Sequence, residues 1–168
     1  MIIYLTGFMG SGKSVVAKEL RRALSFPMLD MDEEIERREK RSISEIFAAE
    51  GEGYFREVET AVLRDLSGRD ILIIACGGGV ILREENRRIM KESGTTVYLS
   101  AKPETIYSRV FQSTTRPLLR GKKSVEEIRE MMEERRPYYE AVADLTLQTD
   151  PLTPPEVAAK ICDFLYPG

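Results

Sequence analysis

Residues 7–14 read GFMGSGKS, a glycine-rich run that ends in a lysine and a hydroxyl side chain. The run matches the pattern G-x-x-x-x-G-K-[ST], in which successive backbone N–H groups face one concavity that accepts phosphate oxygens. Glycine lets the phosphates approach the backbone, while Lys13 can contact the β- and γ-phosphates and Ser14 can ligate magnesium. The pattern predicts a nucleotide phosphate site formed by Gly10, Ser11, Gly12, Lys13, Ser14 and Val15.

A glycine-rich surface turn could match this pattern by chance. The segments on either side of the run help to distinguish such a turn from a phosphate site. Residues 2–6 (IIYLT) form an apolar, strand-like run, and apolar residues recur at helical spacing between Ser14 and Leu24. A strand before the glycines and a helix after them is the arrangement that phosphate binding requires. The flanking pattern therefore favours the phosphate site.

Two carboxylates, Asp30 and Asp32, stand at the end of a second strand predicted over residues 27–30. Parallel strands direct their carboxyl ends toward the ligand crevice, so both side chains are expected near the terminal phosphate. One could hold a hydrated magnesium ion, and the other could orient an acceptor hydroxyl and take its proton. A second interpretation, compatible with the first, makes Asp32 the N-cap of the next helix.

Another glycine-rich stretch, CGGGV, occupies residues 76–80 directly after the apolar strand predicted over residues 71–75. Three glycines at the carboxyl end of a strand indicate that the backbone comes close to another group. A tight turn without a ligand is the alternative, and the stretch by itself does not separate the two interpretations.

Composition limits the chemistry that fits this chain. The 168 residues suit one domain, and 42% hydrophobic with 32% charged residues is typical of a soluble globular protein. A net charge of −3 argues against nucleic acid as the main partner, and without histidine any acid–base chemistry falls to carboxylates or lysine. The sequence shows neither a signal peptide nor a membrane span, which predicts a cytoplasmic protein without a membrane partner.

Short apolar runs alternate with helical patterns along the whole chain. This alternation predicts an α/β fold of three layers, αβα, with a parallel sheet between helices. Residues 113–123 are polar and basic without a helical stripe, so a loop is expected there. The predicted strands are residues 2–6, 27–30, 71–75, 96–99 and 145–147. The predicted helices begin near residues 14, 42, 54, 83, 103, 124 and 155.

Six motifs carry a resemblance to a known family: GFMGSGKS, LDMDEEIE, SISEIFAAEGEGYFREVE, IACGGGV, TTRPLLRG and RRPYYEAVAD. In their order and spacing the sequence resembles the shikimate kinase family. The resemblance implies one P-loop kinase domain over residues 1–168, with a five-stranded parallel sheet and a mobile lid at about residues 113–123. It further implies a monomer that uses ATP and one Mg²⁺ ion to phosphorylate the 3-hydroxyl of shikimate.

On the nucleotide side, the resemblance assigns roles to single residues. Asp30 matches a carboxylate near magnesium and joins Ser14 of the glycine loop as a predicted metal ligand. Arg109 matches an arginine near adenine, and the segment around Pro154 matches the adenine site. Cys76 departs from the threonine or serine common in such kinases and is interpreted by itself as a small core residue. Arg116 matches an arginine of the lid that moves over the phosphates. The residues expected in catalysis are Lys13, Asp32 and Arg116.

On the acceptor side, the resemblance implies two arginines that bind the shikimate carboxylate and an aspartate that engages its hydroxyls and serves as base. Planar guanidinium groups suit a carboxylate because they offer paired donors. Glu59 is expected to support the first arginine, and the glycine backbone to approach the ring. The predicted substrate residues are Asp32, Arg56, Gly78, Gly79 and Arg135.

Several alternatives stay open on sequence alone. Arg56 or Arg135 taken singly would more often be a solvated surface arginine, and Arg136 competes with Arg135. Phe47 and Phe55 could wall the substrate ring or simply belong to the core. Gluconate and nucleoside-monophosphate kinases share the P-loop architecture, and a nucleotide-binding module without catalysis is a further class.

Overall fold

The computed structural model describes residues 1–111 and 124–168 of the chain. In this part of the chain the strands are β1 (Ile2–Thr6), β2 (Met28–Asp30), β3 (Leu72–Ala75), β4 (Thr95–Ser100) and β5 (Leu145–Gln148). They form one sheet in the order β2-β3-β1-β4-β5, and every neighbouring pair is parallel. The predicted five-stranded parallel sheet is confirmed, and each strand lies within one residue of its predicted bounds.

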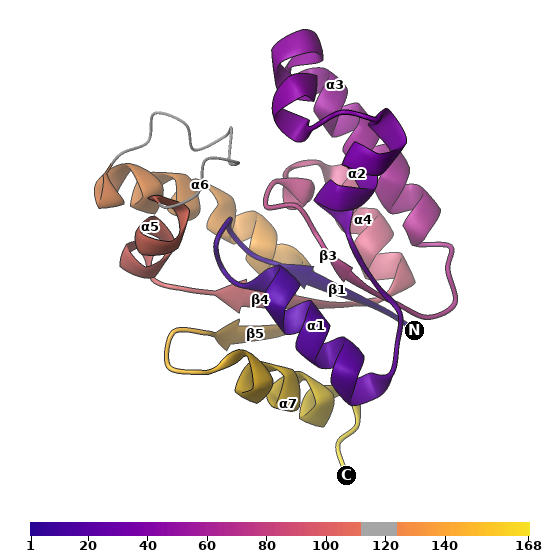
Figure 1. Cartoon of the computed structure of the whole chain (residues 1–168). Coiled ribbons are helices and arrows are strands. Elements are labelled where there is room, and N and C mark those ends of the chain that lie inside the picture. The colour runs from indigo at the N-terminus through magenta and orange to yellow at the C-terminus, as the bar shows by residue number, and fades with distance from the viewer. Residues whose placement is uncertain (112–123) are drawn as a thin grey trace.

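Helices cover both faces of this sheet, as Figure 1 shows. Their bounds in the described part are α1 (Lys13–Leu24), α2 (Met31–Glu39), α3 (Ile43–Leu66), α4 (Glu84–Ser93), α5 (Pro103–Phe111), α6 (Val125–Val142) and α7 (Pro154–Leu165), with a 3₁₀ turn η1 (Val80–Leu82). Helices α1 and α7 pack on one face, whereas α3, α4 and α6 pack on the other. The three-layer prediction is therefore confirmed.

The central strand β1 explains why the chain needs helices on both faces. Ile3 and Leu5 belong to the cluster with α1 and α7, while Ile2 and Tyr4 belong to the cluster with α3, α4 and α6. Successive side chains of a strand point to opposite faces, and all four of these are at most 2% exposed. A strand buried on both faces should read as a nearly continuous apolar run, and IIYLT is apolar up to its last residue, Thr6.

Element α3 contains the two helices that the sequence indicated separately, one through Phe47 and one from about residue 54. A kink at Gly51, whose φ of 85° and ψ of 173° are not helical, separates them. Glycine takes this conformation without a Cβ penalty, so the chain changes direction there between the two helices. The capping box predicted from Ser42 and Glu45 is confirmed at its start.

Helix α2 corrects the assignment of the two aspartates. The side chain of Asp30, not that of Asp32, accepts a hydrogen bond from the backbone N–H of Glu33 and caps the helix. Asp32 lies in the first turn of α2, so the expectation that both carboxylates end the strand was wrong. At the other end of the chain, α7 begins at Pro154 after a capping box between Thr153 and Glu156.

The strand register brings three chain segments to one edge of the sheet. Leu5 lies level with Ala75, and Ala75 lies level with Asp30. The glycine loop after β1, the first turn of α2 after β2 and the glycines after β3 therefore leave the sheet together. No helix in the described residues is long and apolar enough to cross a membrane.

Candidate active site

The loop between β1 and α1 has the backbone that a phosphate site requires. Gly10 and Gly12 have φ angles of 78° and 96°, which other residues rarely adopt. Lys13 begins α1, and its Nζ donates hydrogen bonds to the carbonyl oxygens of Gly7 at 2.6 Å and Phe8 at 3.3 Å. The loop thus places a lysine ammonium and the amino end of a twelve-residue helix at one point.

A hydrogen bond joins the nucleotide loop to the neighbouring strand. Ser14 Oγ donates to Asp30 Oδ2 at 2.6 Å, while Asp30 Oδ1 accepts from the backbone of Glu33 at 3.1 Å. A hydroxyl and a carboxylate are hard oxygen donors, which suit magnesium. In the part of the chain that the structure describes, no group of three or more acidic, cysteine or histidine side chains could hold a metal. Magnesium here would depend on nucleotide phosphates for further ligands, as is usual for this ion.

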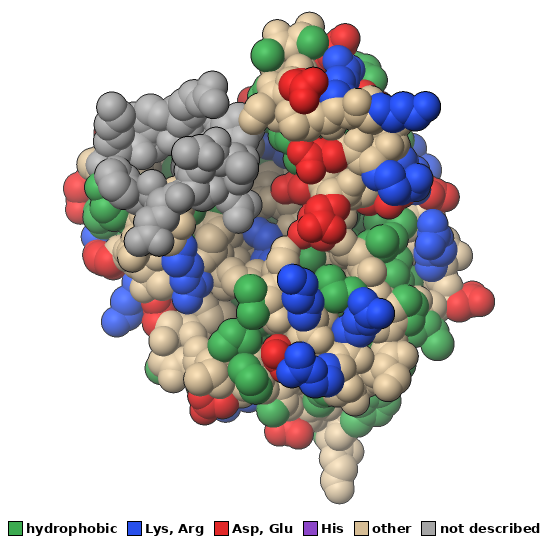
Figure 2. All heavy atoms as spheres, viewed as in Figure 1, with side chains coloured by type: hydrophobic (Ala, Val, Ile, Leu, Met, Phe, Trp, Pro, Cys, Tyr) green, Lys and Arg blue, Asp and Glu red, His purple; other side chains and the backbone are tan. Residues whose placement is uncertain are grey.

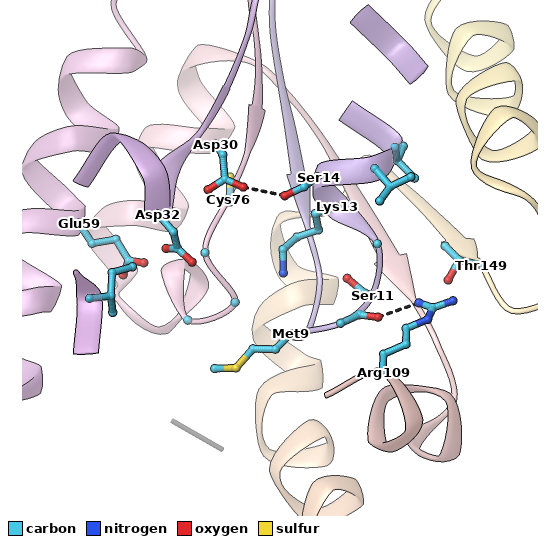
Figure 3. A pocket seen from close by; sticks show the side chains of 18 of the residues that line it. Met9, Ser11, Lys13, Ser14, Asp30, Asp32, Glu59, Cys76, Arg109 and Thr149 are labelled. Carbon is cyan, nitrogen blue, oxygen red and sulfur yellow. Dashed lines mark hydrogen bonds between the residues drawn. The ribbon is translucent and has the colours of Figure 1, made fainter. Parts of the chain in front are cut away.

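Two carboxyl groups meet above the glycine turn that follows β3. A Cβ atom built on Gly77 would lie 2.9 Å from Glu59 Oε2 and 3.0 Å from Asp32 Oδ1. Figure 3 shows Asp32 and Glu59 next to one another on one side of the pocket, with Arg109 and Thr149 on the other and the phosphate loop between them. A side chain at position 77 would therefore displace one or both of these carboxyl groups.

The two predicted acid-binding arginines converge on the same turn. A Cβ atom on Gly79 would lie 2.6 Å from Cζ of Arg56, and one on Gly78 would lie 3.7 Å from Nη1 of Arg135. Both arginines are only 6% exposed, although they come from α3 and α6. The alternative that each is a solvated surface arginine is wrong. Arg136, by contrast, is half exposed and pairs with Glu133 on the same helix.

Arg56 is held by its own helix. Its Nη1 donates to Glu59 Oε1 at 2.9 Å, and its Nη2 lies 3.3 Å from Glu52 Oε2. Burial raises the pKa of Glu59, and the charge of Arg56 opposes that rise. Glu59 Oε2 is buried and has no hydrogen-bond partner within residues 1–111 and 124–168, so this carboxyl group keeps an acceptor for a ligand hydroxyl.

Arg135 is held by an aromatic ring rather than by a carboxylate. Its guanidinium lies 5.6 Å from the centroid of Phe8, a residue of the phosphate loop. Its Nη1 is buried and makes no hydrogen bond to any described residue. A buried charged donor without an acceptor is unfavourable, and an anionic ligand would remove that cost.

One cavity of about 420 Å³ connects the two sides of the site. Figure 2 shows a hollow on this face, with acidic side chains gathered over α2 and α3 and lysine and arginine side chains over α1. Phe47 and Phe55 pack in the core and also line the cavity, so a core position does not exclude a wall for the substrate ring, which stays a prediction. The predicted residues in its lining are Gly10, Ser11, Gly12, Lys13, Ser14, Val15, Asp30, Asp32, Arg56, Gly78, Gly79, Arg109 and Pro154.

Two residues that we predicted in the site, Arg135 and Arg116, are not among the described residues that line the cavity. Arg135 reaches the glycine turn from α6 but is not among the residues that line the cavity. Arg116 and the predicted lid at residues 113–123 lie outside the described residues, so the lid stays a prediction. Cys76 packs in the core and also contributes to the lining, and its burial raises the pKa of its thiol far above the ordinary range.

Sequence reasoning missed several residues of the site. Met9 packs beside Gly78, 3.4 Å from where a Cβ atom would lie on that glycine. Thr149 and Leu152 line the nucleotide side of the cavity. On the same side, Arg109 donates a hydrogen bond to the carbonyl oxygen of Gly10 at 2.7 Å. Thr149 follows β5 directly, so the argument applied to the carboxyl ends of β2 and β3 would have found it. Met9 gave no such signal because apolar residues are common in any loop.

The comparison with known families agrees with this geometry. A family model described as shikimate kinase matches residues 9–166. The chain belongs to the shikimate kinase family. Within this family, the shikimate kinase of Thermodesulfovibrio yellowstonii is 42% identical over 159 residues, which cover 95% of this chain and 91% of that protein. The shikimate kinase of Bacillus cereus strain G9842 is 46% identical, with 82% of each chain covered.

Solved structures of shikimate kinases have the same architecture. The shikimate kinase of Acinetobacter baumannii, solved in complex with shikimate, matches with a TM-score of 0.94 and 38% identity, covering 98% of this chain and 92% of that one. The shikimate kinase of Aquifex aeolicus matches with a TM-score of 0.83 and 41% identity, covering 98% and 96%. The P-loop kinase fold implied by the sequence motifs is thereby confirmed.

Proposed function

We propose that this member of the shikimate kinase family transfers the γ-phosphoryl group of ATP to the 3-hydroxyl of shikimate. One observation carries the proposal: a single cavity is lined both by the phosphate loop and by Asp32, Arg56 and the glycine turn. A phosphoryl donor and a small acid can therefore meet there without either leaving its subsite.

The nucleotide side supplies charge and orientation rather than covalent chemistry. Backbone N–H groups of the loop and the Lys13 ammonium bind the phosphates, and Arg109 and Pro154 border the space for the base. Ser14 and Asp30 would hold magnesium, which when bound neutralises phosphate charge. Because phosphoryl transfer passes through a loose transition state, fixing the donor in line with the acceptor is the main task.

The acceptor side recognises an acid that carries hydroxyl groups. Arg56 and Arg135 bind its carboxylate from the two sides of the glycine turn, and the Oε2 of Glu59 is left for a hydroxyl. Asp32 orients the attacking hydroxyl and takes its proton as the P–O bond forms. No histidine competes for this role, since the chain contains none.

The test is ADP production with and without shikimate, followed by phosphorus NMR of the product to locate the phosphorylated oxygen. We expect ADP release that depends on shikimate and a phosphate on the 3-hydroxyl. Gluconate, AMP and CMP serve as rival acceptors in the same assay. Faster turnover with one of these would replace the proposal, and ATP binding without any acceptor phosphorylation would favour a non-catalytic nucleotide-binding module.

Three further properties remain predictions. A monomeric state, a cytoplasmic location and the absence of nucleic acid and membrane partners follow from the sequence-based reasoning alone. Size-exclusion chromatography with light scattering at several protein concentrations tests the first of these directly. A mass near twice the 19.1 kDa of the chain would contradict it.

A further inference from the structure

Tyr139 is a buried tyrosine that the proposed reaction does not use. It lies on α6, is 1% exposed, and its ring stacks on Tyr98 of β4 with centroids 4.8 Å apart and an 8° angle between the planes. Its hydroxyl donates a hydrogen bond to the carbonyl oxygen of Gly78. One side chain thus connects α6, the sheet and the glycine turn.

The same side chain stands beside one of the two acid-binding arginines. Tyr139 follows Arg135 by four residues, so both project from one face of α6. Gly78 is the point where they meet, because its carbonyl accepts from Tyr139 and its Cα faces Arg135. Burial raises the pKa of Tyr139 far above the ordinary range, and the charge of Arg135 opposes that rise, so the phenol keeps its proton at neutral pH.

Within residues 1–111 and 124–168, few hydrogen bonds fix the orientation of the glycine turn. Residues 77–79 carry no side chains, and the backbone hydrogen bonds of these glycines run from Val80 N–H to the carbonyl of Gly77 and from Leu82 N–H to that of Gly79, while Met9 packs beside Gly78. In a trans peptide, C=O and the following N–H point in opposite directions. A hydroxyl that holds the Gly78 carbonyl toward α6 therefore turns the Gly79 N–H away from α6.

We propose that Tyr139 is a positioning residue for the acceptor acid: it holds the Gly78–Gly79 peptide and the neighbouring Arg135 in the arrangement that receives the carboxylate. The inference rests on the proposed function, since it concerns the acceptor subsite of that reaction. Tyr139 is not among the residues that line the cavity, so it would touch neither nucleotide nor acceptor. Tyr139 acts through the Gly78–Gly79 backbone and through Arg135. Its removal should therefore change the binding of shikimate and leave the binding of ATP unchanged.

The test is Tyr139→Phe, which keeps the ring stacked on Tyr98 and removes only the hydroxyl. We expect the KM for shikimate to rise about fivefold to tenfold, the usual effect of losing one buried hydrogen bond, while the KM for ATP changes less than twofold. The amide of Gly79 should also exchange its hydrogen faster, with the amides of β3 unchanged. Tyr138→Phe is the matched control, because Tyr138 is 39% exposed, packs on Arg87 and should change neither KM.

Each other result counts against the proposal. An unchanged KM for shikimate, an equal rise in both KM values, or loss of the cooperative unfolding transition in Tyr139→Phe would overturn it, the last two by showing a general structural role. These outcomes can be told apart from failure of the proposed function. If the proposed function were wrong, the unaltered protein itself would release no ADP in response to shikimate.

Discussion

The two sides of the cavity are built in opposite ways. The nucleotide side is built mainly on one contiguous run, residues 7–14 at the start of α1, with Arg109, Thr149 and Pro154 at its border. The acceptor side gathers side chains from α2, α3 and α6 on a turn that has none, and both of its arginines are 6% exposed. The nucleotide side therefore depends on local conformation, whereas the acceptor side depends on how distant elements pack.

This difference predicts that substitutions on the two sides separate cleanly. A change in the acceptor side should alter shikimate binding or turnover and leave ATP affinity nearly constant, because the phosphate loop holds its own conformation. Contacts between the sides include Ser14 with Asp30, Phe8 with Arg135 and Met9 with Gly78. The predictions below test the separation, beginning with the largest effect.

Asp32→Asn should have the largest effect. It removes the proposed base while keeping the shape of the side chain, and we expect kcat to fall about 10³-fold with the dissociation constant for ATP within twofold of the original value. Steady-state kinetics and equilibrium titration with ATP measure the two quantities. Glu33→Gln is the control, since it removes a charge from the same helical turn at an exposed position. A parallel loss of ATP binding in Asp32→Asn would mean that the two sides are not separate.

Arg135→Ala should act on binding of the acid. Removing two charge-assisted hydrogen bonds should raise the KM for shikimate about 10²-fold. The neighbouring Arg136→Ala is a matched control because that side chain is half exposed and pairs only with Glu133 among the described residues. Equal effects of the two substitutions would contradict the assignment of Arg135 to the acceptor side.

Gly79→Ala should have a smaller effect by steric means. Gly79 has a φ of −99°, which alanine adopts freely, so the cost comes from the collision of the new methyl group with the guanidinium of Arg56. Displacing that group should raise the KM for shikimate roughly tenfold. Gly53→Ala serves as control, because nothing lies within 4 Å of its Cβ position. An unchanged KM in Gly79→Ala would show that Arg56 can bind the acid from another position.

Glu34 offers the smallest and most indirect test. The hydrogen bond from Arg37, joined by Arg38, lowers the pKa of Glu34 from 4.5 to about 2, and Arg38 also pairs with Asp65 of α3. A lowered carboxyl pKa stabilises the fold fully above pH 4.5, and that contribution is lost as the pH falls toward 2.

We expect Glu34→Gln to flatten this acid-side fall in the free energy of unfolding and to lower the melting temperature at pH 7 by roughly 3 °C. Denaturant or thermal unfolding at several pH values measures it. Glu92→Gln, at an exposed position of α4, should follow the unaltered protein. If the variant had the same pH dependence of stability as the unaltered protein, Glu34 would not stabilise the packing of α2 against α3.

The sequence by itself determined the sheet and the nucleotide side. Strand β1 is buried on both faces and reads as a nearly continuous apolar run, and the backbone of the glycine loop follows from glycine at positions 10 and 12, whose φ angles are positive. The residues of the loop are consecutive in the sequence and therefore lie next to one another in the structure. All residues from Gly10 to Val15 line the cavity, as their position in the glycine motif led us to expect.

Only the tertiary structure decided the acceptor side. Nothing local shows that Arg56 and Arg135 are buried, that Asp30 rather than Asp32 caps α2, or that Tyr139 bonds to Gly78. The family motifs pointed to the arginines, but their environment arises where α3 and α6 approach the turn after β3. The physical reason is that burial and side-chain pairing depend on distant segments, whereas backbone conformation depends on neighbours in the chain.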